Sequence, residues 1–242
     1  MLEKITSLTN PKIKNVAKAL DAKGDYFVVE GFHMVEMALS KGVVESVFTI
    51  EKTVKAKVPQ YLITEPILKK ITFSKTPEGI VALCRKSLHS PIKNDHGLYL
   101  ENVRDPGNLG TLLRSALAFH FYDVVLSKGC AEVYSPKVLM ASQGAIFYLN
   151  VRQSENASSL DDLKELKNKG YHILGTDLAS SKPLKSLQIP SKIALLLGNE
   201  GQGLSKEAIE FADQNVRIEM DGIDSLNVGV AGGIIMYETS LK

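Results

Sequence analysis

Three segments of this 242-residue chain are richer in polar residues and glycine than regular secondary structure requires. The first spans residues 102–114, where a predicted strand ends and Pro106 starts a predicted helix. Asn108 lies in the first turn of that helix and Arg114 lies further along it. Polar groups at the carboxyl end of a strand, beside a helix N-terminus, lie where open α/β sheets bind ligands. Ordinary turn formation by residues 105–107 is the alternative interpretation.

The second segment is a loop in which a predicted buried strand runs directly into Gly198, Gly201 and Gly203. Glycine lets a backbone approach a ligand closely. The loop lacks the Lys-Ser/Thr ending of a P-loop and does not match the dinucleotide pattern GxGxxG. The carboxylate of Glu200 disfavours a phosphate and favours a cationic or hydroxyl-bearing ligand. A glycine-rich connection capped by Ser205 is the alternative.

The third segment, residues 218–231, precedes and begins the last predicted helix. Ser225 is the predicted N-cap, and Asn227 follows in the first turn with its amide free to bind a ligand. The helix has a face of small residues, Gly229, Ala231, Gly232 and Gly233. Glycine inside a helix costs roughly 0.5–1 kcal/mol relative to alanine, so close packing of backbone, ligand or a second subunit is implied. Simple helix–sheet packing is the alternative.

Alternating strands and helices are predicted to position these segments, which makes the chain α/β. Apolar runs such as residues 193–197 are typical of buried parallel strands. In the second part of the chain, strands are predicted over residues 97–103, 124–127, 149–152, 173–176, 193–197 and 216–220. Helices are predicted there over residues 106–119, 136–147, 159–169, 205–212 and 226–241. Before them, strands are predicted over residues 26–29, 43–50, 61–64 and 79–84, and helices over residues 11–22, 32–41 and 66–71.

A polar, proline-containing stretch at residues 88–95 suggests a domain boundary. We predict a first domain over residues 1–90, a linker over 91–96 and a second domain over 97–242. The net charge is +5 in residues 1–95 and −3 in the remainder. This split suggests a polyanion-binding module joined to a domain of different charge, although ordinary surface scatter would also produce it.

The composition excludes several classes of protein. With 44% hydrophobic and 23% charged residues, the chain is typical of a soluble globular protein. It has no apolar run of about 18 residues and no secretory signal at its N-terminus, so we predict no membrane span. Cys84 and Cys130 lack CxxC spacing and nearby histidine pairs, which predicts a reducing cytoplasm, no disulfide and no metal site. The scattered histidines are assigned no role.

Taken together, the three segments resemble the motifs of the SpoU (TrmH-like) RNA ribose methyltransferases of the SPOUT superfamily. The first motif is matched at Asn102, Asp105, Pro106, Asn108, Gly110, Arg114 and Ala116. The second is matched at Leu195, Gly198, Asn199, Glu200, Gly203, Leu204 and Ser205. The third is matched at Ile218, Met220, Gly222, Ser225, Leu226, Asn227, Val228, Val230 and Ala231. With residues 135–144, the resemblance covers roughly residues 98–240.

The N-terminal part resembles the small substrate-binding domain of the same family, which is similar in fold to ribosomal protein L30e. Residues 7–14 and 27–31 carry this weaker resemblance. The family implies an α/β fold in which a mostly parallel, deeply trefoil-knotted C-terminal SPOUT domain follows the L30e-like α/β domain. Three residues depart from the family pattern: Glu219 stands in place of a usual Pro, His120 in place of a usual Gly, and Met140 in place of a usual Arg.

The resemblance implies an S-adenosylmethionine-dependent enzyme that methylates a ribose 2′-hydroxyl of RNA, with ribosomal RNA favoured over transfer RNA. The implied cofactor-binding residues are Thr176, Gly198, Asn199, Gly203, Ile218, Met220 and Leu226. The implied catalytic residues are Asn108, Arg114, Glu200, Ser225 and Asn227. A homodimer in the cytoplasm, without membrane or metal, is also implied. The basic N-terminal domain is expected to contact the RNA.

The family assigns removal of the hydroxyl proton to the arginine of the first motif, here Arg114. Because arginine stays protonated in proteins, we expect Arg114 to clamp a neighbouring phosphate and to stabilise the developing alkoxide. Three other functions stay open: a non-catalytic RNA-binding protein that kept the fold, methylation of a base, and a nucleotide-binding metabolic enzyme of doubly wound type. The last lacks a phosphate-binding or dinucleotide motif.

Overall fold

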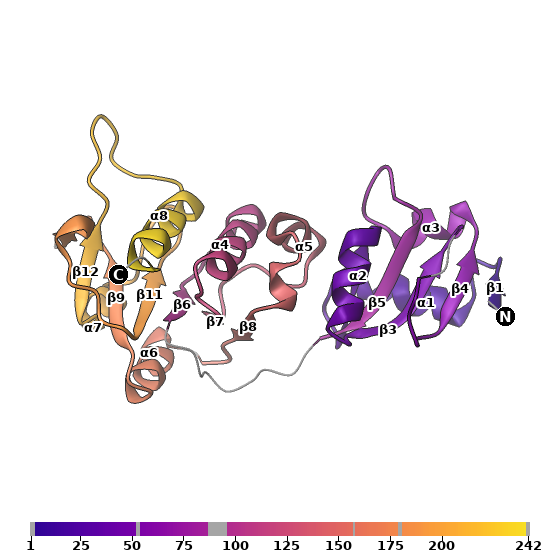
Figure 1. The fold of residues 1–242 in the computed structure, drawn as a ribbon, viewed down its shortest axis with the longest axis horizontal. Helices are drawn as coiled ribbons and strands as arrows, with labels where there is room; N and C mark the ends of the chain where they lie inside the picture. Colours follow the sequence, from indigo (N-terminus) through magenta and orange to yellow (C-terminus); the bar gives the residue numbers. More distant parts are fainter. Residues whose placement is uncertain (1–2, 52–53, 87–95, 157, 179–180, 241–242) are drawn as a thin grey trace. The chain divides into compact units, whose positions relative to one another are not determined.

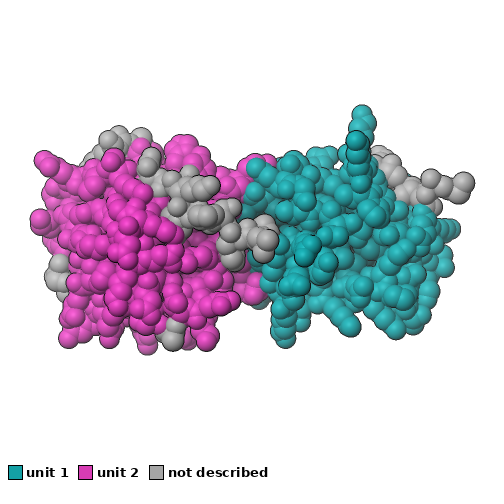
Figure 2. All heavy atoms as spheres, turned by 90° about the horizontal axis from the view of Figure 1, so that it is seen from below, with its two compact units in different colours: residues 1–88, 134–147 teal, residues 89–133, 148–242 magenta. Residues whose placement is uncertain are grey.

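Two separate β-sheets organise the computed structural model, which describes residues 3–51, 54–86, 96–156, 158–178 and 181–240. The chain divides into two compact units, coloured separately in Figure 2. The first contains residues 1–88 and 134–147, and the second contains residues 89–133 and 148–242. Residues 91–95 of the predicted linker lie outside the described residues, and His96 already begins a strand. None of the described helices is long and apolar enough to span a membrane.

The sheet of the first unit is mixed, with the strand order β1-β4-β3-β5-β2 (Figure 1). β5 pairs antiparallel with β2 and β3, while β4 pairs parallel with β1 and β3. Its strands are β1 (Glu3–Ile5), β2 (Tyr26–Glu30), β3 (Val44–Thr49), β4 (Gln60–Ile63) and β5 (Ile80–Arg85). Its helices include α1 (Pro11–Ala19), α2 (Phe32–Ser40) and α3 (Glu65–Ile71). The prediction missed only the three-residue edge strand β1 here.

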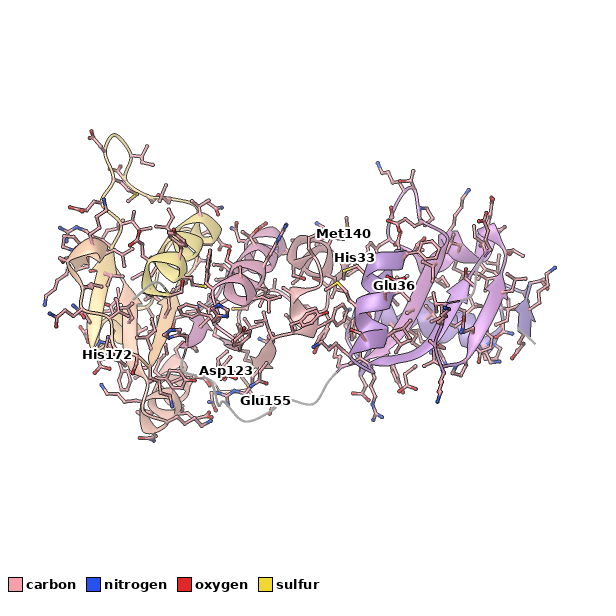
Figure 3. The ribbon with its side chains drawn as sticks, in the orientation of Figure 1. His33, Glu36, Asp123, Met140, Glu155 and His172 are labelled. Carbon is pink, nitrogen blue, oxygen red and sulfur yellow. The ribbon has the colours of Figure 1, made fainter. Side chains whose placement is uncertain are left out.

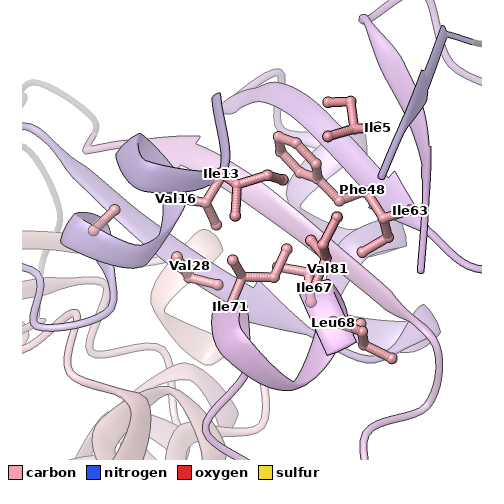
Figure 4. Close-up of a cluster of buried hydrophobic side chains, with 11 residues drawn as sticks. Ile5, Ile13, Val16, Val28, Phe48, Ile63, Ile67, Leu68, Ile71 and Val81 are labelled. Atoms are coloured by element: carbon pink, nitrogen blue, oxygen red, sulfur yellow. The ribbon is translucent and has the colours of Figure 1, made fainter. Parts of the chain in front are cut away.

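One face of this sheet is buried beneath α1 and α3. Ile13 and Val16 of α1 and Ile67 and Ile71 of α3 pack with Phe48 of β3 in an apolar cluster (Figure 4). Apolar residues at three- and four-residue spacing place each helix's buried stripe on the sheet. Asn10 starts α1, because its side chain accepts a hydrogen bond from the amide of Lys12.

Residues 134–147 pack with the first unit, although the sequence places them in the second domain. The rings of Phe27 and Tyr134 lie 4.5 Å apart. The prediction of a single helix over residues 136–147 is wrong. The helix α5 (Pro136–Ser142) ends at Ser142, and the separate 3-10 helix η1 (Ala145–Phe147) follows it. Gln143 and Gly144 between them have φ of 49° and 81°, a left-handed conformation that ends a helix.

All strand pairs in the sheet of the second unit are parallel, and its order is β10-β12-β9-β11-β6-β7-β8. Its strands are β6 (His96–Leu100), β7 (Asp123–Leu126), β8 (Asn150–Gln153), β9 (His172–Thr176), β10 (Lys182–Pro183), β11 (Ile193–Leu197) and β12 (Gln214–Arg217). β10 and the 3-10 helix η2 (Leu184–Ser186) were not predicted. The predicted strand over residues 216–220 is too late, because β12 begins at Gln214 and ends at Arg217, which pairs with Pro183 of β10.

Helices cover both faces of this sheet (Figure 1). α6 (Ser159–Asn168) and α7 (Lys206–Phe211) contact each other and β9, while α4 (Pro106–Ala118) contacts α8 (Val228–Ser240). Gly232 of α8 explains the close approach of α4 and α8. A Cβ there would lie 2.4 Å from Leu112 of α4 and 2.7 Å from Leu197 of β11. Part of the small-residue face therefore serves helix–helix and helix–sheet packing.

Candidate functional site

A pocket of about 320 Å³ lies where β9, β11 and β12 of the parallel sheet end. In open α/β sheets, ligands bind beyond the carboxyl ends of the strands because the loops there converge. The pocket is lined by every residue that the sequence predicted to bind the cofactor: Thr176, Gly198, Asn199, Gly203, Ile218, Met220 and Leu226. Two of the predicted catalytic residues, Glu200 and Ser225, also line it. The structure thus brings the second and third motifs to one cavity.

The wall of the pocket is the loop from Gly198 to Gly203, which closes on itself. Backbone hydrogen bonds of 3.0 and 2.8 Å join Asn199 and Gly203 in both directions. The side-chain Oδ1 of Asn199 accepts hydrogen bonds from the backbone amides of Gly201 and Gln202. A Cβ on Gly198 would lie 2.1 Å from the carbonyl carbon of Gly203. The glycine at position 198 is therefore required for this tight turn, which leaves backbone facing the pocket.

The first motif touches this loop through Glu200. The Asn108 side-chain amide donates to Glu200 Oε1 at 3.1 Å, and the Asp105 amide approaches the same oxygen at 3.3 Å. Asn102, in the left-handed conformation that asparagine tolerates (φ 55°), accepts a 3.0 Å hydrogen bond from the Asn199 side chain with its carbonyl oxygen. Residues far apart in the sequence therefore fix the position of one carboxylate.

Asn227 connects the third motif to the same cluster. Its side-chain Nδ2 donates to Asn108 Oδ1 at 2.8 Å, while its Oδ1 accepts the amides of Gly229 and Val230 at 2.9 and 3.3 Å. Two sequence-based predictions are therefore wrong. The residue that caps α8 is Asn227 rather than Ser225, and the Asn227 amide is engaged rather than free. The cause is that the helix begins at Val228, which leaves Asn227 at the position whose side chain reaches the first free amides.

Arg114 stands apart from this cluster. It lies exposed on α4 and does not line the pocket. It lies six positions after Asn108 on the helix, so the two side chains point about 120° apart around the helix axis. Among the described residues, none forms an ion pair or hydrogen bond with the side chain of Arg114. Its guanidinium is therefore available to a bound molecule.

Several residues that line the pocket were not singled out from the sequence, although some lie inside the quoted motifs. Leu204 and Val228 belong to the second and third motifs, so their neighbours carried the signal. Of the others, Leu197 and Gln202 lie within the second segment, and Asp177, Leu178 and Arg217 lie in or beside the end of a strand. Ile209 lies in a predicted helix and had no signal of its own. Thr176 is tied to the neighbouring strand β11, because its hydroxyl donates to the carbonyl of Leu196 at 3.1 Å.

Groups that often carry other chemistry lie elsewhere or are unreactive. Burial raises the pKa of the Cys130 thiol, so it stays protonated and is a poor nucleophile. His172, labelled in Figure 3, lies at the amino end of β9, opposite the edge that carries the pocket. Within the described part of the chain, no cluster of three or more His, Cys, Asp or Glu side chains is placed to hold a metal ion.

Comparison with known families gives two matches. Residues 95–237 match the SpoU rRNA Methylase family. Residues 10–82 match the MRM3-like substrate binding domain. The first match covers more than half of the chain and contains all three motifs, while the second falls within the first unit.

Individual relatives resemble the chain over nearly its whole length. The 23S rRNA (guanosine(2553)-2′-O)-methyltransferase RlmP of Bacillus subtilis is 32% identical over 98% of both chains. An uncharacterized tRNA/rRNA methyltransferase of Synechocystis is 30% identical over 97% of this chain and 92% of its own. The crystal structure of an rRNA methyltransferase from Sinorhizobium meliloti superposes with a TM-score of 0.87 at 27% identity, covering 98% of this chain and 97% of that one. Its AdoMet-bound form superposes with a TM-score of 0.86.

Proposed function

The chain belongs to the SpoU rRNA Methylase family, and we propose that the pocket of its second unit binds S-adenosylmethionine for methylation of a ribose 2′-hydroxyl in ribosomal RNA. The chain is an S-adenosylmethionine-dependent RNA methyltransferase. The observation that carries the assignment to the site is the convergence of the cofactor-binding and catalytic motifs around one cavity.

The pocket fits the cofactor in size and chemistry. Its volume of about 320 Å³ falls within the range of roughly 300–1,000 Å³ of small-molecule sites. Ile218, Met220 and Leu226 offer apolar surface to an adenine, and the backbone of residues 198–203 offers hydrogen-bonding groups. The Glu200 carboxylate on the lining suits a positively charged ligand. Glu219, one of the three residues that depart from the family pattern, is exposed and does not line this pocket.

When bound, the cofactor supplies an electrophilic methyl group on a sulfonium sulfur. Asn108 and Asn227 are already oriented by their mutual hydrogen bond and by Glu200, so we propose that they position the ribose. Arg114 binds the adjacent phosphate and stabilises negative charge on the 2′-oxygen as its proton leaves to solvent. Ser225, exposed at the pocket, is a further polar group that can contact the ribose.

The first unit is proposed to hold the RNA. Its match to a substrate binding domain and the net charge of +5 in residues 1–95 support this role. Exposed Lys55 and Lys57 lie beside Phe32, which is 36% exposed, and the three line one hollow. Lysines beside an exposed aromatic ring suit the phosphates and bases of unpaired RNA. Ribosomal RNA is favoured over transfer RNA because the relative RlmP is a 23S rRNA methyltransferase.

We further propose a homodimer whose second unit is knotted. Val230, Ile234 and Tyr237 of α8 are 51%, 37% and 48% exposed and recur at helical spacing, which leaves an apolar stripe suited to a second copy. The family resemblance implies the trefoil knot. Both cysteines are free thiols, which supports a cytoplasmic location. Light scattering should give a dimer at micromolar concentration; a monomer would count against this arrangement.

The test of the proposed function is calorimetry followed by an activity assay. We expect S-adenosylhomocysteine to bind to the protein, and NAD and ATP not to bind. Radiolabelled methyl groups from S-adenosylmethionine should then enter total RNA that lacks modifications. Binding without transfer would indicate the non-catalytic RNA-binding alternative, and binding of NAD or ATP alone would indicate a metabolic enzyme.

A further inference from the structure

We propose that Glu101, a buried carboxylate outside the catalytic cluster, is a positioning residue that holds the Gly198–Gly203 loop in its binding conformation. This inference rests on the proposed binding of S-adenosylmethionine at that loop. Glu101 follows β6 directly and its side chain is only 2% exposed. Burial of a carboxylate is costly unless hydrogen bonds satisfy its oxygens, so its partners indicate why it is there.

Glu101 contacts both ends of the loop. Its backbone amide donates to the carbonyl of Leu197 at 2.9 Å, immediately before Gly198. Its Oε2 accepts the amide of Ser205 at 2.7 Å, and its Oε1 accepts the hydroxyl of Ser205 at 2.9 Å. Glu101 therefore holds the chain at Leu197, directly before the loop, and at Ser205, two positions after the loop.

The held segment includes a residue of the pocket itself. Leu204, between Gly203 and Ser205, lines the pocket and is 6% exposed in the apolar core of the second unit. Moving Ser205 would therefore move both the wall of the pocket and a buried leucine. The Ser205 hydroxyl also accepts the amide of Ala208, so the same contact fixes the start of α7.

A third donor to Glu101 provides a matched control. The Ser159 hydroxyl donates to Glu101 Oε1 at 2.5 Å from the first turn of α6, and Ser159 does not line the pocket. Removing that hydroxyl disturbs the same carboxylate without touching the loop. If Glu101 only stabilised the fold, the Ser159 and Ser205 contacts would be equivalent for ligand binding. If it positions the loop, only the Ser205 contact affects the pocket.

The experiment measures the Kd of S-adenosylhomocysteine by calorimetry on the full chain, below the unfolding temperature of each variant. Glu101→Met removes both acceptors at similar volume, and we expect binding weaker by on the order of tenfold or more. Glu101→Gln keeps a carbonyl oxygen for the Ser205 amide, because the serine hydroxyls can turn to accept, and should restore most of the affinity. Ser159→Ala should bind like the wild type. The KM for S-adenosylmethionine should rise more than kcat falls.

Wild-type affinity in folded Glu101→Met would overturn the proposal, as would an equal loss in Ser159→Ala. If Glu101→Met does not fold, Ser205→Ala decides, with Ser158→Ala as its control. Both remove a helix N-cap, but only Ser205 contacts the loop. We expect severalfold weaker binding in Ser205→Ala alone; equal affinities would refute the inference. Failure of the wild type to bind would instead refute the proposed function and this inference with it.

Discussion

The two units are both α/β, yet all three motifs lie in the second. In the first unit, β5 runs antiparallel to both of its neighbours, while the other four strands share one direction, so the sheet is mixed. In the second unit every described strand pair is parallel, so the residues after β6, β9, β11 and β12 meet at one edge. Parallel pairing therefore brings the motifs of the second unit together, while the RNA-holding role that we propose for the first unit rests on its charge and its family match.

The largest effect should come from Arg114, which tests whether chemistry resides in the second unit. Arg114→Ala removes the proposed phosphate clamp, so we expect methyl transfer to fall by about 10²–10³-fold. S-adenosylhomocysteine affinity should be unchanged, because Arg114 does not line the pocket. Arg114→Lys should be intermediate, since it keeps the charge and loses bidentate geometry. Full activity of Arg114→Ala would remove this residue from the catalytic set.

Next in size is the effect of adding a side chain at Gly198 in the glycine-rich loop. In Gly198→Ala the new Cβ meets backbone atoms of Gly203 and Leu204 at 2.1–2.2 Å, which cannot move without opening the turn. We expect S-adenosylhomocysteine binding to weaken on the order of a hundredfold by calorimetry. Gly201→Ala is the control, because its Cβ would lie an ordinary 3.6 Å from the Asn199 side chain. Equal affinities of the two variants would contradict the described pocket wall.

A smaller effect should separate the two contacts of Asn227. Asn227→Asp keeps an oxygen to cap α8 but cannot donate to Asn108. We expect kcat to fall about tenfold with the free energy of unfolding nearly unchanged, since Asp and Asn cap equally well. Asn227→Ala should lose activity and also about 1 kcal/mol of stability. If the aspartate variant keeps full kcat, the hydrogen bond to Asn108 is irrelevant to catalysis.

The smallest effect is expected in the first unit, where many weak contacts share the binding of RNA. The double variant Lys55→Gln, Lys57→Gln should lower RNA affinity severalfold and reduce the slope of log affinity against log salt by about one to two. S-adenosylhomocysteine affinity should not change. Filter binding across a salt series measures the first effect. An unchanged slope would show that the RNA contacts a different surface of the protein.

The sequence predicted most of this arrangement where local signals exist. Apolar runs and caps located α1, α4, α6 and α7 to within a few residues, and the motifs identified the predicted cofactor-binding residues that line the pocket. The break of the helix at Gln143 was missed, although the following Gly144 is a typical helix-ending residue.

Long-range contacts had no comparable signal. From the sequence, Asn227 could be either the N-cap of the last helix or a residue of its first turn. The start of α8 at Val228 decides for the N-cap. No local sequence pattern distinguishes Glu101 from an ordinary polar residue at a strand end, because its partner Ser205 lies 104 residues away. The packing of residues 134–147 in the first unit depends on tertiary contacts such as Phe27 with Tyr134. Such contacts depend on three-dimensional packing that local periodicity does not encode.

The most direct test of the central claim is to identify the methylated nucleoside. Ribosomal RNA lacking modifications would be incubated with the protein and labelled S-adenosylmethionine, then digested to nucleosides and mapped. We expect one 2′-O-methylated nucleoside with the wild type and at most a trace of it with Arg114→Ala. A base-methylated product, or no product with a protein that binds S-adenosylhomocysteine, would contradict the proposed ribose chemistry.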